Sequence, residues 1–130
     1  MLWLKGWGAA LLAVGLLDAL WLGWIARGFY VREMGDLMAA QVRTLPALLF
    51  YVGYPAGVAA LVLWPRPEAL PEAVLRAALV GLLVYGTYDL TNMATLRHWS
   101  LRLALVDVAW GTLVSAAAGA AAHLATRPAA

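Results

Sequence analysis

The sequence predicts an all-α polytopic membrane protein, a four-transmembrane-helix bundle that forms a single domain over residues 1–130. Two observations carry this prediction. The chain is 65% hydrophobic and only 12% charged, with a mean hydropathy of +0.81, whereas a soluble domain carries about twice that charge fraction. In addition, four stretches are long enough to span a bilayer, which takes about 20 apolar residues in a helix.

The four spans are expected near residues 7–26, 45–64, 71–96 and 101–124. Arg27 closes the first span. Pro46 lies in the first turn of the second span and Pro65 just beyond its end, which are positions that suit proline. Pro71 begins the third span in the same way. Pro55 lies inside the second span, where a missing N–H is expected to kink the helix.

The connections between the spans differ in character. Residues 28–43 mix aromatic and charged side chains and are expected to form an amphipathic helix in the membrane interface. Residues 64–71 predict a short, stiff crossing, and residues 97–100 predict a tight turn between antiparallel neighbours. Two stripes of small residues, Gly53-x3-Gly57 and Gly111-x3-Ser115-x3-Gly119, predict close helix packing.

An even number of spans places both termini on one side of the membrane. We call the end that holds residues 27–44 and 97–100 side B, and the opposite end side A. Five arginines lie near side B and four basic residues near side A, so the positive-inside rule gives no firm orientation.

Three aspartates lie inside the apolar spans: Asp18, Asp89 and Asp107. A carboxylate in a bilayer costs a few kcal/mol (about 2.5–3.5 on insertion scales), so such residues usually face the bundle interior and mark a site. Counted at 1.5 Å per residue from the side-B arginines, all three lie roughly 8–14 Å deep. The sequence therefore predicts one polar cluster in the side-B half of the bundle.

Aromatic and amide side chains share helix faces with these aspartates. Tyr85, Tyr88, Asp89 and Asn92 follow one helical stripe, and Asp-x-x-Trp occurs in both the first and fourth spans. A buried carboxylate held by an indole can also be purely structural. The candidate ligand-binding residues are Asp18, Trp21, Tyr51, Tyr54, Tyr85, Tyr88, Asp89, Asn92, Asp107 and Trp110.

Composition excludes several kinds of chemistry. The chain has no cysteine, and its one lysine, Lys5, lies at the membrane edge, which excludes a Schiff base inside the bundle. His98 and His123 lie near opposite ends of the fourth span. We therefore expect no metal or cofactor. An all-oxygen cation site on the aspartates and Asn92 stays open but has no supporting motif. No basic tract predicts nucleic-acid binding.

Three functions fit this pattern. The first is binding or transport of a small apolar or lipid-like molecule, with transport favouring a homodimer. The second is a membrane-embedded lipid-modifying enzyme that uses paired aspartates as acid and base. The third is a structural or partner-stabilising subunit. In the first two, Asp89 is expected to matter most, and at least one aspartate is expected to hold a proton near neutral pH.

Several motifs together carry a family resemblance. They are Asp18-Ala-Leu-Trp-Leu-Gly23, Ala26-Arg-Gly-Phe-Tyr30, Phe50-Tyr51-x-x-Tyr54, Tyr85-Gly-Thr-Tyr-Asp-Leu-Thr-Asn-Met-Ala-Thr-Leu96 and Asp107-x-x-Trp110-Gly111. The chain resembles a small bacterial four-helix membrane family catalogued as a domain of unknown function, number 2177. The resemblance implies a multi-pass protein of the bacterial inner membrane and a shared site at the motif residues. It implies no particular activity.

Overall fold

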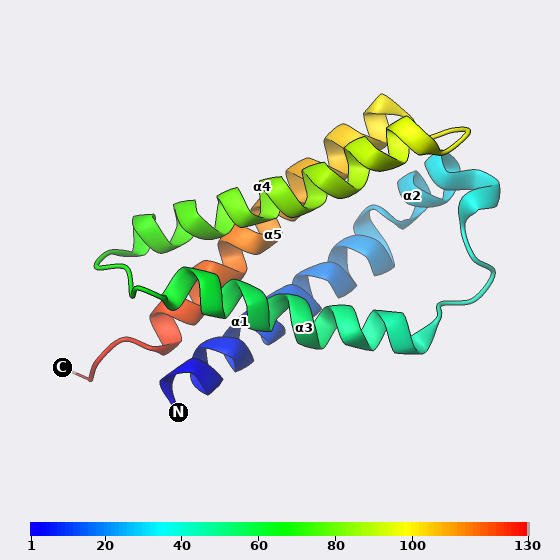
Figure 1. Ribbon diagram of the computed structural model, residues 1–130. Coiled ribbons are helices and arrows are strands. Elements are labelled where there is room, and N and C mark those ends of the chain that lie inside the picture. Colours follow the sequence, from blue (N-terminus) through cyan, green and yellow to red (C-terminus); the bar gives the residue numbers. More distant parts are fainter. Residues whose placement is uncertain (130) are drawn as a thin grey trace.

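The computed structural model describes residues 1–129, which contain helices, turns and loops and no strand (Figure 1). The first span comprises α1 (Leu2–Leu20) and a π-helical stretch (Trp21–Ile25) that continues it. A short helix, α2 (Arg27–Met34), and a 3-10 turn (Gly35–Leu37) follow. The three remaining long helices are α3 (Thr44–Leu63), α4 (Leu70–Thr95) and α5 (Leu101–Ala125).

Four helices are long and apolar enough to cross a membrane, and their bounds follow the predicted spans closely. The predicted all-α, four-span fold is therefore confirmed. The first span begins at Leu2 rather than near residue 7. The apolar residues before Lys5 extend the helix, and one lysine near a helix end can reach water along its own stem. Helix α3 continues through Pro55 as one helix.

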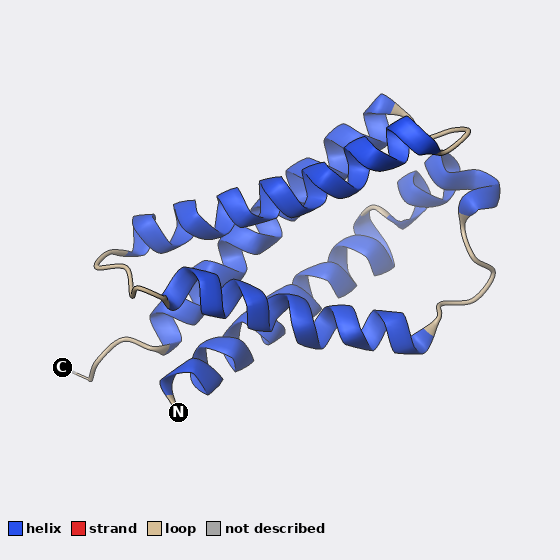
Figure 2. Cartoon of the chain, in the orientation of Figure 1, coloured by secondary structure: helices blue, strands red, loops and turns tan. Residues whose placement is uncertain are grey.

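Helices α4 and α5 form an antiparallel hairpin that runs the length of the molecule (Figures 1 and 2). The predicted tight turn joins them at residues 96–100. Ser100 caps α5, because its hydroxyl oxygen accepts a hydrogen bond from the backbone N–H of Leu103 at 2.9 Å. Helix α1 packs on α5 and α3. The chain begins and ends at the same end of the bundle, side A (Figure 1).

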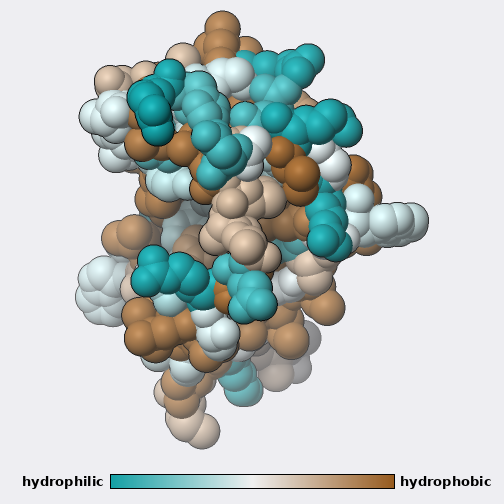
Figure 3. Space-filling model, turned by 90° about the vertical axis from the view of Figure 1, so that its right-hand side faces the viewer, coloured by the Kyte–Doolittle hydropathy of each residue, from teal (hydrophilic) through white to brown (hydrophobic). Residues whose placement is uncertain are grey.

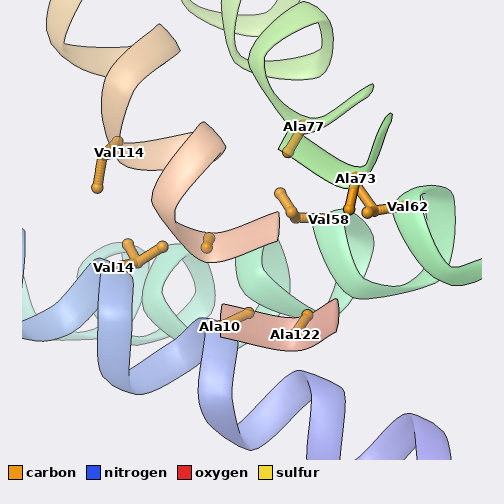
Figure 4. Close-up of a cluster of buried hydrophobic side chains, with 9 residues drawn as sticks. Ala10, Val14, Val58, Val62, Ala73, Ala77, Val114 and Ala122 are labelled. Atoms are coloured by element: carbon orange, nitrogen blue, oxygen red, sulfur yellow. The ribbon is translucent and has the colours of Figure 1, made fainter. Parts of the chain in front are cut away.

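The side-A half of the bundle is packed with small side chains from all four long helices (Figure 4). Because these residues are small, the helix backbones approach one another closely, which is the packing mode that membrane helices favour. The cluster consists of Ala10, Val14, Val58, Val62, Ala73, Ala77, Val114, Ala118 and Ala122.

The α4–α5 contact depends on glycine. A Cβ atom on Gly81 would lie 2.4 Å from the Gly111 carbonyl oxygen, and one on Gly119 would lie 2.3 Å from the Ala77 Cβ. The predicted packing stripe through Gly111, Ser115 and Gly119 is therefore confirmed. The stripe on α3 is different, because Gly53 and Gly57 have no such neighbour within 4 Å among the described residues.

The connection after the first span confirms a short helix and corrects its length. Helix α2 ends at Met34, and Met38–Arg43 has no helical structure. Glu33 holds α2 against the start of α5, since its carboxylate accepts hydrogen bonds from the Ser100 hydroxyl, at 2.5 Å, and from the Arg102 guanidinium.

Figure 3 views the molecule from side B, where polar side chains cover much of the surface.

Candidate functional site

Asp18 is the first of the three intramembrane carboxyl groups, and two neutral donors hold it. The Trp110 indole N–H donates to Oδ1 at 2.7 Å, and the Tyr51 hydroxyl donates to Oδ2 at 3.1 Å. These partners come from α5 and α3, so Asp18 joins three helices at one point. Its side chain is buried, with 2% exposure. Both oxygens have a donor, as a buried carboxyl group requires.

Asp107 is held from the α2 segment. The Tyr30 hydroxyl donates to its Oδ1 at 2.7 Å, and the Trp21 indole N–H donates to the Tyr30 oxygen at 3.4 Å. Tyr30 is itself buried, and burial raises the pKa of its hydroxyl above the ordinary value of 10. Tyr30 therefore stays protonated and keeps donating to Asp107.

Asp89 is completely buried and is the least satisfied of the three. The Trp99 indole N–H donates to its Oδ1 at 3.0 Å, but its Oδ2 has no donor among the described residues. The carboxyl group of Asp107 is its nearest acidic neighbour. Two ionised carboxylates have no hydrogen to share, so this is where the proton expected from the sequence would lie.

Aromatic stacking connects the two halves of this network. The Trp21 and Trp110 rings lie parallel, with centroids 4.6 Å apart and planes 9° apart. Trp21 begins the π-helical stretch Trp21–Ile25, and single π turns inside helices occur frequently at functional sites. No arginine or lysine forms an ion pair with the three aspartates among residues 1–129.

A cavity of about 670 Å³ opens beside this network on side B. Asp107 and Tyr30 provide polar atoms on its wall, and Arg27 also lines it. The rest of the wall is mainly apolar and aromatic, and includes Met34 and Trp99. The cavity therefore combines an apolar wall with a few polar groups, which is the usual character of a small-molecule site.

The comparison with protein families agrees with these motifs. The family described as "Predicted membrane protein (DUF2177)" matches residues 3–124, nearly the whole chain. The chain belongs to the DUF2177 family. No curated protein and no solved structure gives a significant match. The family description supports a multi-pass membrane protein and assigns no activity.

The structure brings most of the predicted DUF2177 site residues together. The six that form the network or its stack are Asp18, Trp21, Tyr51, Asp89, Asp107 and Trp110. Tyr88 lines the cavity and contacts the Trp99 ring edge-on.

The other three lie beside the network. Tyr54 bonds to the Ser115 hydroxyl at 2.5 Å and meets Tyr85 edge-on. The Asn92 amide lies toward the Tyr88 hydroxyl, with no hydrogen bond to an aspartate among the described residues.

Three contributors were missed or misread from the sequence. Tyr30 lies outside the four spans, so its contact with Asp107 gives no periodic signal. Trp99 fits a membrane-interface residue by its position, yet it donates to Asp89. The sequence predicts only a packing role for Ser115, but its hydroxyl also forms a hydrogen bond with the Tyr54 hydroxyl. A search for buried aromatic donors in the connections, as well as in the spans, points to Tyr30 and Trp99.

Proposed function

We propose that this DUF2177 protein binds a small apolar or lipid-like molecule in the side-B cavity, with the polar or cationic end of the ligand at Asp107 and Tyr30. The observation that carries this proposal is the cavity itself, whose volume of about 670 Å³ falls in the range of roughly 300–1,000 Å³ for ligand sites. Its apolar wall suits a hydrocarbon body, and its few polar atoms suit one polar end.

The Asp89–Asp107 pair gives this site an adjustable charge. With one shared proton the pair carries a single negative charge, which an amine or other cation can neutralise in the cavity. Asp107 faces the cavity, while Asp89 lies behind it and is fully buried. A protein that keeps an uncompensated carboxyl pair at this depth bears a cost, which a ligand cation offsets.

A direct binding test uses dodecylamine as the probe and dodecanoic acid as its oppositely charged counterpart. We expect saturable dodecylamine binding to purified protein in detergent, measured by calorimetry or native mass spectrometry, and weaker binding of the acid. Asp107→Asn should remove the preference for the amine, because it removes the negative charge at the cavity wall.

A matched pair of glycine variants locates the site. Gly23 lines the cavity, and a Cβ there meets nothing within 4 Å, so Gly23→Leu should fill the cavity without a clash. Gly15→Leu is the control, since Gly15 also has open space but does not line the cavity. Equal dodecylamine binding in the two variants would contradict the proposal.

Transport of the bound molecule is an extension of this proposal. A separate groove of about 400 Å³ between α4 and α5 ends at Asp89, whose side chain is completely buried, so transport would require this carboxyl group to become accessible. A homodimer of so small a unit would provide a longer path across the bilayer. Proteoliposomes should then accumulate labelled dodecylamine with wild-type protein and fail to do so with Asp89→Asn. Light scattering of the purified protein in detergent measures its molecular mass and so shows whether it is a dimer.

A second candidate is a membrane-embedded lipid-modifying enzyme. The observation that favours it is the same carboxyl pair, because one protonated and one ionised aspartate in contact can serve as acid and base. Mass spectrometry of a phospholipid extract incubated with pure protein tests it. Lipid products that appear with wild-type protein and are absent with Asp107→Asn favour the enzyme over a binding protein.

A further inference from the structure

Side A carries a basic groove that is separate from the aspartate cluster. Its volume is about 610 Å³, and it lies between the α3–α4 connection and the end of α5. Arg66 and Arg127 line it from these two segments, together with His123. Among the described residues, Glu68 provides the one carboxylate that lines it, and Glu68 is exposed. The described wall therefore has an excess of positive charge.

Arg66 is fixed in this groove, and its hydrogen-bond partners among the described residues are a hydroxyl and a carbonyl oxygen. Its Nη1 donates to the Thr126 hydroxyl at 2.7 Å, and its Nη2 donates to the His123 carbonyl at 3.5 Å. A guanidinium has five N–H donors, so most remain for another acceptor. Among residues 1–129 no carboxylate forms an ion pair with Arg66, since the nearby Glu72 pairs with Arg76. A half-buried guanidinium whose charge no described carboxylate neutralises favours binding of an anion.

His123 gives a second and independent indication. Its side chain is 3% exposed, and its Nδ1 has no hydrogen-bond partner among the described residues. Buried polar atoms in native proteins nearly always have a partner, so an unpartnered ring nitrogen on a residue that lines the groove needs an explanation. A ligand oxygen in the groove would provide the missing partner.

We propose that the side-A groove binds a phosphate group, held by the guanidinium groups of Arg66 and Arg127 and by the His123 imidazole. Planar guanidinium donors match the oxygens of a phosphate in pairs. The groove lies at the membrane boundary, at the end of the α3 and α5 spans. The phosphate of an anionic phospholipid head group reaches this level, and so does free phosphate from the water.

The two histidines allow a direct test on the intact protein. The chain contains only His98 and His123, so protein labelled with ¹⁵N-histidine gives two sets of ring signals, and His98→Gln assigns them. The labelled protein in detergent is titrated with phosphatidylglycerol, with diacylglycerol of the same chains, and with inorganic phosphate. The readout is the position of the His123 ring signals.

We expect phosphatidylglycerol to shift the His123 signals with saturation and diacylglycerol to leave them in place. Arg127→Gln should weaken this binding about tenfold, without unfolding the bundle, because Arg127 is exposed. Arg66→Gln should weaken it as much. Arg97→Gln removes one exposed charge on side B and should change nothing.

The titrations separate the two sources of phosphate. A shift with the lipid and none with millimolar inorganic phosphate assigns a phospholipid head group. A shift with inorganic phosphate alone assigns free phosphate. No shift with either overturns the proposal, as does an equal shift with diacylglycerol or an equal loss of affinity in Arg97→Gln.

Discussion

The two halves of the bundle use opposite kinds of side chain. On side A, alanine, glycine and valine bring the helix backbones together, and the core is apolar. On side B, the helices are separated by tryptophan and tyrosine rings and by three carboxyl groups, and a cavity remains between them. Small side chains pack helices at low cost, so the side-A half can hold the bundle while the side-B half keeps an open polar site.

The largest effect is expected where the close packing of α4 on α5 is broken. Gly81→Ala places a Cβ 2.4 Å from the Gly111 carbonyl oxygen, and this contact is with backbone, which cannot move aside easily. We expect a loss of about 3 kcal/mol or non-folding, in the upper range of overpacking effects. Unfolding by denaturing detergent measures it.

Gly86→Ala on the same helix is the control for this change. A Cβ at Gly86 meets nothing within 4 Å, so the same substitution should stabilise the helix by about 0.5–1 kcal/mol. Equal effects of the two substitutions would show that helix propensity, and not close packing, determines the stability of α4 on α5.

A smaller loss is expected when one donor of the side-B network is removed. Tyr30→Phe leaves Asp107 Oδ1 without its donor, which should cost about 1–3 kcal/mol. Tyr88→Phe is the comparison, because Tyr88 is 52% exposed, and this change should stay within about 0.5 kcal/mol. If Tyr30→Phe is also neutral, α2 does not dock on Asp107 in the membrane.

Asp89→Asn should change stability less than Tyr30→Phe and should mainly change the site. The substitution keeps the side-chain shape, so the bundle should remain folded, and the shared proton is lost while Asp107 keeps the single negative charge of the pair. Infrared spectra of wild-type protein at neutral pH should show a protonated carboxyl band that is absent in Asp89→Asn. A sharp loss of thermal stability with unchanged dodecylamine binding would make Asp89 a structural residue.

The smallest effect concerns the attachment of α2. Hydrogen bonds from Ser100 and from Arg102 hold the pKa of Glu33 below its ordinary value of 4.5. The attachment is therefore complete above pH 4.5 and is lost as the pH falls through the lower pKa of the folded protein. A spin label on Val31→Cys, in a chain without other cysteines, should become more mobile on acidification. Glu33→Gln should remove that pH step.

The sequence predicts the long helices well because hydropathy over 20 residues is a strong, local signal. It also places the three aspartates in one half of the bundle, because depth follows from counting residues along each helix. It does not predict the Tyr30–Asp107 contact, because that contact depends on the bend at Ala26 that places α2 beside α5. It does not predict the cavity either, since a cavity depends on how far apart the helices lie. The open face at Gly53 shows that a small-residue stripe alone does not identify its neighbour.

The π-helical stretch at Trp21–Ile25 also determines the direction in which the residues after it face. A π turn holds one residue more than the α-helical ladder needs, so it resembles a one-residue insertion that the helix has absorbed. Each residue of an α-helix turns the chain by about 100°. If the same five residues were α-helical, everything after them would be turned by about that angle from its present direction. Tyr30 would then face away from Asp107, so the side-B site depends on the π turn, in a helix that would span the membrane equally well without it. Deleting Leu22 should remove the π turn and its extra residue together and leave Tyr30 close to its present face.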